Sequence, residues 1–166
     1  MDYAKLTHLN GQWLRGADDA RLRGEVVERL AKSGHTVSTE AMERILTLMP
    51  GLKERAKTLE DLTSSAAFLT REVPLPFEPK AEALLTPEAR ELLGRLATVL
   101  AGVAFETAEI DAALRGFAEA EGRKLGQVAQ PLRAALTGST MSPGIDATLM
   151  ALGKDEALKR IAAVAG

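Results

Sequence analysis

The side chains of this chain that could carry out chemistry are few and scattered. The 166 residues include no cysteine, which excludes disulfides, thiolate zinc sites and cysteine nucleophiles. The two histidines, His8 and His35, lie far apart and have no carboxylates near them at metal-ligand spacing. The HExxH, GxSxG, GxxxxGK[ST] and GxGxxG motifs do not occur. From its residues alone, the chain is predicted to hold no metal site and no catalytic residue.

Acidic pairs and hydroxyl groups give the same result. Glu25 with Glu28, and Glu40 with Glu43, are spaced to share a helix face, but such pairs are far more often solvated surface than a general acid and base. The hydroxyl run at residues 63–65 lies in an expected helix without a base to activate it. The chain alone is therefore not expected to be a self-sufficient enzyme.

The distribution of charge is more informative than its total of -2. Residues 1–66 carry ten basic and ten acidic side chains, residues 67–122 carry five and ten, and residues 123–166 carry six and three. The basic last quarter is compatible with a local phosphate-binding surface. A sequence pI near 5.8 argues against indiscriminate coating of nucleic acid.

The most unusual segment is residues 123–138. Pro131 stands inside an expected short helix, where proline costs about 3 kcal/mol, and Arg133 follows between small and apolar neighbours. Residues 142–144, Ser-Pro-Gly, then open another helix whose free N–H groups can receive an anion or a base-edge acceptor. On the residues alone, a kinked helix followed by an ordinary helix start is the favoured explanation of the segment.

Helices must position these residues, because composition favours an all-α fold. Aromatic residues make up 4% of the chain, and alanine, leucine, glutamate, arginine and lysine, all strong helix formers, dominate it. Apolar spacing and helix end signals predict helices over 18–33, from Ser38 to Pro50-Gly51, from Thr58 to Leu69, from Thr86 to Gly102, from a Thr107 N-cap to Gly122, and over 127–136, 145–152 and 156–164. The helix that follows Thr86 is expected to bury Val99 among its leucines.

A proline-rich break divides these helices into two groups. Residues 73–79 hold three prolines, too many for a helix interior. The sequence therefore predicts two small helical domains in tandem, residues 1–75 and residues 76–166.

The unusual segment 123–138 contains KLGQVAQPLRAALTG at 124–138, and several further motifs accompany it: SPG at 142–144 and LGK at 152–154, with LRGFA at 114–118 and shorter matches in residues 5–15. Together, and most strongly over residues 110–160, they resemble the C-terminal signature of bacterial glutamyl-tRNA synthetases. The resemblance extends over essentially the whole chain, and a fifteen-residue match with an interior proline is highly specific.

This resemblance implies that the chain is the anticodon-binding half of such an enzyme. The HIGH-like and KMSKS-like motifs of the family's catalytic domain do not occur here, so ATP, Mg²⁺ and the ligation of glutamate to tRNA would belong to the missing half. No cofactor is expected in this chain, and the chain is expected to be inactive alone. The family's half is an all-helical cage, with a stem-contacting first domain (1–75) and an anticodon-binding second domain (76–166).

The resemblance also assigns site residues position by position. Arg55 resembles the arginine that inspects the third anticodon base, and Arg133 the one that contacts the first two. Ser142, Pro143, Gly144 and Ile145 resemble the loop that packs against the splayed bases. Stacking and edge hydrogen bonds are how proteins read single-stranded bases.

Asp146 departs from the family pattern, in which a large apolar residue can follow Ile145. A carboxylate at this helix start suits the helix dipole and would repel phosphate, or it could accept a hydrogen bond from a base amino group. An arginine at position 55 would favour strict reading of the glutamate anticodon.

We therefore expect glutamate-accepting tRNA as the partner of a monomeric, cytoplasmic chain. The opening residues 1–5 lack a secretory signal, and no apolar run approaches the ~20 residues of a membrane span. The alternative is a helical scaffold that binds protein without RNA, through apolar grooves such as that around Phe68 and Phe77. An enzyme with an unrecognised site would need a pocket of perturbed titratable groups.

Overall fold

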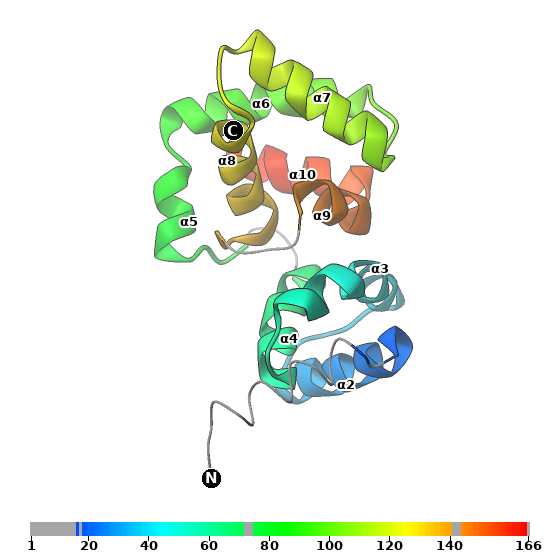
Figure 1. Ribbon diagram of the computed structural model, residues 1–166. Helices are drawn as coiled ribbons and strands as arrows, with labels where there is room; N and C mark the ends of the chain where they lie inside the picture. The colour runs from blue at the N-terminus through cyan, green and yellow to red at the C-terminus, as the bar shows by residue number, and fades with distance from the viewer. Residues whose placement is uncertain (1–15, 17, 72–74, 141–143, 166) are drawn as a thin grey trace. The chain divides into compact units, whose positions relative to one another are not determined.

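The computed structural model describes residues 16, 18–71, 75–140 and 144–165. Over these residues the chain is α-helical with one short 3₁₀ helix and without β-strands, which confirms the all-α prediction. It divides into two compact units, an N-terminal unit of residues 1–71 and a C-terminal unit of residues 72–166 (Figure 1).

In the residues that the structure describes, the N-terminal unit packs three α-helices and a 3₁₀ helix around one core. These are α2 (Asp19–Lys32), α3 (Thr39–Arg55), α4 (Leu59–Ala66) and the 3₁₀ helix Ala67–Thr70. Each α-helix begins after a polar N-cap residue, Asp18, Ser38 and Thr58 respectively, whose side chain accepts a hydrogen bond from a backbone N–H of the first turn. The large side chains that are fully buried in this core are Leu22, Leu30, Ile45, Leu48, Met49, Leu52, Leu62 and Leu69.

The predicted end of a helix at Pro50-Gly51 is wrong, because α3 continues through both residues to Arg55. Pro50 lies on the exposed side of α3, where water can bond the carbonyl that loses its helical donor. Met49 and Leu52, on either side of it, are 0% and 1% exposed. Burial of these side chains outweighs the local break signal.

The C-terminal unit contains six α-helices in its described residues. They are α5 (Pro79–Leu84), α6 (Pro87–Ala101), α7 (Thr107–Ala120), α8 (Leu125–Thr137), α9 (Ile145–Leu152) and α10 (Lys154–Ala165). The sequence did not predict α5, which begins at the last proline of the break. Proline at the first helical position is favourable, because its missing N–H would have no helical partner there.

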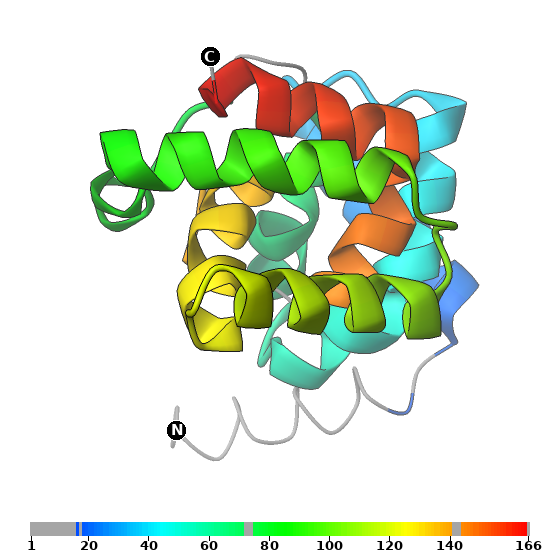
Figure 2. The same ribbon diagram turned by 90° about the horizontal axis from the view of Figure 1, so that it is seen from above.

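Helices α6 and α10 lie side by side and antiparallel (Figure 2). At one end the Arg90 guanidinium donates to the Val164 carbonyl at 3.0 Å. At the other end Lys154 Nζ donates to the Ala101 carbonyl at 3.2 Å. Side chains from each helix thus satisfy the last carbonyls of the other, which otherwise lack helical donors.

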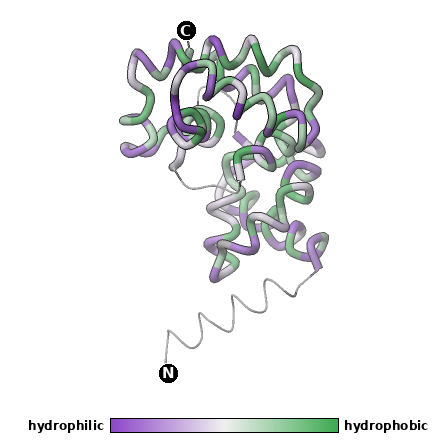
Figure 3. The backbone as a smooth tube through the Cα atoms, turned by 45° about the horizontal axis from the view of Figure 1, so that its top comes forward, coloured by the Kyte–Doolittle hydropathy of each residue, from purple (hydrophilic) through white to green (hydrophobic). Residues whose placement is uncertain are grey.

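Helix α8 is the centre of this unit, since it contacts each of the other five described helices. Hydrophobic and hydrophilic positions alternate along the turns of the helices (Figure 3), but α8 buries more than one face. Its buried residues are Val128, Pro131, Leu132 and Ala134–Thr137. Pro131 therefore lies inside a helix that is held by packing on several sides.

Two details of the helix prediction are wrong. Thr107 is the first helical residue of α7, and Glu106 occupies the N-cap without a side-chain hydrogen bond. Val99, expected in the core, is 38% exposed, because the inward side of α6 is already filled by Leu92, Leu93, Leu96 and Leu100. The predicted Thr86 cap and Gly102 end of α6 are confirmed.

The tight turn at Gly138, directly after α8, packs against the segment that precedes α5. Gly138 has a φ of 75°, and a Cβ on it would lie 2.3 Å from the Pro76 carbonyl oxygen. The Glu78 N–H donates to the Gly138 carbonyl at 2.8 Å, and Ser139 Oγ donates to Glu78 Oε2 at 3.2 Å. Only glycine combines the positive φ with this approach of the two backbones.

Gly138→Ala is expected to lower the free energy of unfolding by about 2 kcal/mol or more, because it combines left-handed strain with a backbone clash. Chemical denaturation would measure the loss. Gly116→Ala in α7 is the control, since a Cβ there meets nothing within 4 Å and should stabilise the helix by about 0.5–1 kcal/mol. Equal stability of the Gly138 variant and the wild type would contradict this account.

Candidate nucleic-acid interface

Arg133 lies one turn before the end of α8 and is half-buried. Its neighbours Leu132 and Ala134 are both 0% exposed, so packing fixes the backbone that carries the guanidinium. Gln130, one turn earlier on the same face, is exposed. This edge of α8 thus carries an exposed amide, Gln130, and a half-buried arginine, Arg133.

The end of α8 is secured by side chains on both sides. Thr137 Oγ1 donates to the Arg133 carbonyl at 2.8 Å and accepts from the Ser139 N–H at 3.1 Å. Arg160 of α10, which is 1% exposed, donates from Nη1 to the Leu136 carbonyl at 2.7 Å. The backbone that carries Arg133 therefore has hydrogen bonds from within α8 and from α10.

Helix α9 begins at Gly144, an exposed N-cap without a side-chain hydrogen bond. Because glycine has no side chain that could accept a hydrogen bond, Gly144 does not cap the first N–H groups of this helix. Ile145 and Asp146 follow, both half-buried. Asp146 Oδ1 would lie 2.9 Å from a Cβ placed on Gly144, so the carboxylate lies against the helix start and makes it less attractive to phosphate.

The structure places the predicted site residues in both units. Arg133 lies on α8, and Gly144 and Ile145 lie at the start of α9. These two helices contact one another. Ser142 and Pro143 lie outside the described residues. Arg55 is the last residue of α3, and its side chain is likewise outside the described part.

Near Arg55, α3 is tied to the start of α2 by an ion pair. Lys53 Nζ lies 2.6 Å from Asp19 Oδ1, and the side chains are 19% and 32% exposed. At the end of α3 the Ala56 N–H bonds the Leu52 carbonyl at 3.2 Å. The Asp19–Lys53 pair thus fixes the last turns of the helix that carries Arg55.

Other kinds of site find little support in the described residues. Within 16, 18–71, 75–140 and 144–165, no group of three or more histidine and acidic side chains is placed to hold a metal ion. No helix in those ranges combines the length and apolar character that crossing a membrane requires. Phe68, proposed to line an apolar groove, is 7% exposed and so presents little surface to a partner.

Comparison with known proteins identifies the family. A family model described as an anticodon-binding domain matches residues 17–165. The chain belongs to the anticodon-binding domain family. This match covers both units, and the resemblance that the sequence showed is thereby confirmed.

Similar proteins of this family carry a consistent name. The chain is 65% identical to glutamate–tRNA ligase 1 of Gluconacetobacter diazotrophicus over 99% of its length. It is 57% identical to glutamate–tRNA ligase 1 of Gluconobacter oxydans, also over 99%. It covers 36% and 35% of these relatives, so it spans about a third of their length.

A solved structure agrees in fold with the anticodon-binding domain described here. The crystal structure of a glutamate tRNA ligase from Elizabethkingia meningosepticum, in complex with its amino acid, matches with a TM-score of 0.82 at 27% identity. The match covers 99% of this chain and 32% of that one. The all-helical architecture is therefore that of part of a larger ligase chain.

Sequence reasoning missed Arg160 and Glu78, which hold the end of α8 and the turn after it. A signal for Arg160 was present: it lies on the apolar side of α10, in register with Ala157, Ile161 and Val164. For Glu78, 61 residues before its partner Ser139, no local pattern indicates the contact.

Asp19→Asn is expected to destabilise the N-terminal unit by about 1 kcal/mol, at the upper end for an ion pair that is not fully buried. Thermal unfolding would measure it. Glu28→Gln is the matched control, because its ion pair with Lys32 has side chains that are 63% and 74% exposed and should contribute less than about 0.5 kcal/mol. Equal effects of the two variants would show that the Asp19–Lys53 pair is no anchor.

Proposed function

We propose that this chain is the anticodon-binding part of a glutamate–tRNA ligase and that it binds glutamate-accepting tRNA through the anticodon. The observation that carries the proposal is the anticodon-binding family match over residues 17–165, joined to relatives that are named glutamate–tRNA ligase. Activation of glutamate with ATP and Mg²⁺, and its transfer to tRNA, belong to the rest of the full-length enzyme, which is monomeric and cytoplasmic.

In this proposal, Arg133 contacts the first two anticodon bases. Its guanidinium is planar and presents several donors in a fixed arrangement, which suits both base edges and base faces. Rigid placement favours the role, because the neighbouring residues on α8 are fully buried. A side chain that starts from a fixed backbone loses less conformational freedom on binding.

The start of α9 supplies the second part of the proposed surface. Gly144 and Ile145, with Ser142 and Pro143 before them, pack against the unstacked bases. The Asp146 carboxylate beside Gly144 disfavours a phosphate here and favours the amino group of a base, which can donate to it. We therefore assign this helix start to base recognition and not to binding of the RNA backbone.

The N-terminal half has a different part in the proposal. Residues 1–75 form the domain that contacts the tRNA stem, and Arg55 inspects the third anticodon base. Residues 76–166 form the domain that reads the other two bases.

The test is a titration of this chain against glutamate tRNA and against a copy with a substituted anticodon, each at two salt concentrations. Tighter binding to the native anticodon supports the proposal. Equal, salt-dependent binding to both would indicate a binder of RNA backbone or shape. Binding to neither, by a folded chain, would contradict the proposal and favour the protein-binding scaffold.

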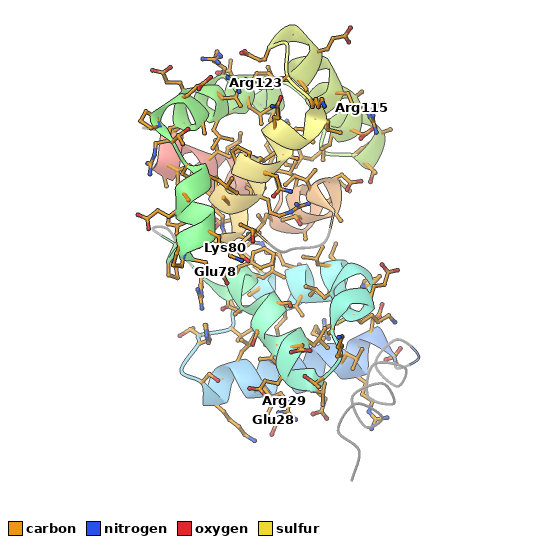
Figure 4. All side chains as sticks on the ribbon, turned by 60° about the vertical axis from the view of Figure 1, so that its left-hand side comes forward. Glu28, Arg29, Glu78, Lys80, Arg115 and Arg123 are labelled. Carbon is orange, nitrogen blue, oxygen red and sulfur yellow. The ribbon has the colours of Figure 1, made fainter. Side chains whose placement is uncertain are left out.

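Arg133→Ala is expected to weaken binding of the native tRNA by about 1–3 kcal/mol, the range of a good bidentate base contact, and to leave the substituted tRNA nearly unaffected. Arg115→Ala is the control for the loss of one positive charge. Arg115 is 66% exposed on α7 and pairs only locally with Asp111 at 2.9 Å (Figure 4). Unchanged affinity of the Arg133 variant, with the fold intact by circular dichroism, would remove Arg133 from the site.

A further inference from the structure

Arg160 is a buried charge whose hydrogen bonds lead to the proposed site. Its side chain is fully enclosed, with Nε 2.9 Å from Glu156 Oε1 on the same helix and Nη1 2.7 Å from the Leu136 carbonyl of α8. Leu136 follows Arg133 by three residues. The bond from Arg160 therefore acts on the turn of α8 that carries Arg133.

Packing alone does not account for an arginine at this position. A buried ion pair loses the hydration of both charges, and apolar residues of similar volume are often as stable or more stable in its place. What the guanidinium supplies is direction: two donors on one rigid plane, aimed at a carboxylate and at a helix-end carbonyl. A methionine or leucine would fill the space without fixing the carbonyl.

The bond to Leu136 belongs to a connected set of hydrogen bonds around the end of α8. The Gly138 N–H donates to the Ala134 carbonyl at 2.9 Å, and the Glu78 N–H donates to the Gly138 carbonyl at 2.8 Å. Ser139 then reaches Glu78, whose place at the start of α5 is labelled in Figure 4. Arg160 contributes to this set from α10, the last helix of the unit. Glu78 contributes to it from the start of α5, the first described helix of the unit.

We propose that Arg160 is a positioning residue for anticodon reading, which sets the last turn of α8 and thereby the Arg133 guanidinium. This inference rests on the proposed function. Arg160 is buried and makes no contact with RNA itself. It acts because a recognition side chain holds its geometry only as well as the residues behind it.

The test compares Arg160→Lys and Arg160→Met with the wild type in the same two-tRNA titration, well below the unfolding temperature. Lysine keeps the charge without the planar fork, and methionine keeps the volume without donors. Both should reduce the ratio of affinities for native and substituted anticodons about fivefold or more, at the lower end of what one base contact contributes. Arg90→Met is the control, because Arg90 donates to the carbonyls of Leu85 and Val164, neither of which belongs to α8.

Amide hydrogen exchange separates positioning from simple loss of stability. Positioning predicts that the N–H groups of Gly138 and Glu78 exchange faster in the Arg160 variants while those of α6 keep their rates. A purely structural role predicts uniformly faster exchange and an unchanged affinity ratio, which would overturn the inference. Should Arg160→Met fail to fold, Arg160→Lys and Glu156→Gln decide the question by the same two measurements.

The two proposals fail differently. A wild-type chain that binds both tRNAs equally overturns the proposed function and this inference with it. A wild-type chain that discriminates, with Arg160 variants that discriminate equally well, overturns the inference alone.

Discussion

The enclosed end of α8 is the constraint on which the C-terminal unit depends. The last carbonyls of any helix lack donors from within it, and here residues 134–138 are all buried, so water cannot replace them. Two of these carbonyls are bonded by identified partners: Ala134 accepts from the Gly138 N–H and Leu136 accepts from the Arg160 guanidinium. One turn earlier, the Thr137 hydroxyl donates to the carbonyl of the half-buried Arg133. An unsatisfied carbonyl in this position would cost about 1–3 kcal/mol.

That constraint explains features that look unfavourable when taken singly. Pro131 removes a hydrogen bond inside α8, yet it is buried in a helix that every other described helix of the unit contacts. Packing offsets the loss, because burying an apolar side chain contributes about 1.5–3 kcal/mol. Gly138 adopts a positive φ at little cost because it has no Cβ, and the nearby Pro76 backbone leaves no room for one. Both residues keep α8 in one place, which is the requirement for a recognition side chain mounted on it.

The sequence predicted most of the helix ends that neighbouring residues decide, with the N-cap of α7 and the short α5 as exceptions, and it missed what distant contacts decide. The N-caps Ser38, Thr58 and Thr86 and the bounds of α9 follow from neighbouring residues, and the structure confirms them. Pro50 was misjudged because the core contacts of Met49 and Leu52, made with other helices, override a local break.

The candidate site divides in the same way. A specific segment match drew attention to Arg133 and to the start of α9, and the structure shows where Arg133, Gly144 and Ile145 lie. It does not test their roles, which remain predictions. The apolar register of α10 distinguishes Arg160 from its neighbour Lys159, but the carbonyl of α8 that lies opposite Arg160 is tertiary information and gives no signal in the sequence.

The charge distribution indicates which kind of RNA contact this chain is suited to make. A net charge of -2 gives little long-range attraction for a polyanion, and α9 begins beside a carboxylate and not beside a lysine or arginine. Binding based on phosphate neutralisation needs several cations and loses affinity steeply with salt. Contacts to base edges and faces need few charges but exact placement. The structure offers placement: one half-buried arginine on a central helix, with the helix end secured from α10 and from the turn at Gly138. In the proposed function, affinity and selectivity therefore depend on the rigid placement of Arg133 by α8. In less selective RNA-binding proteins, affinity depends on net positive charge.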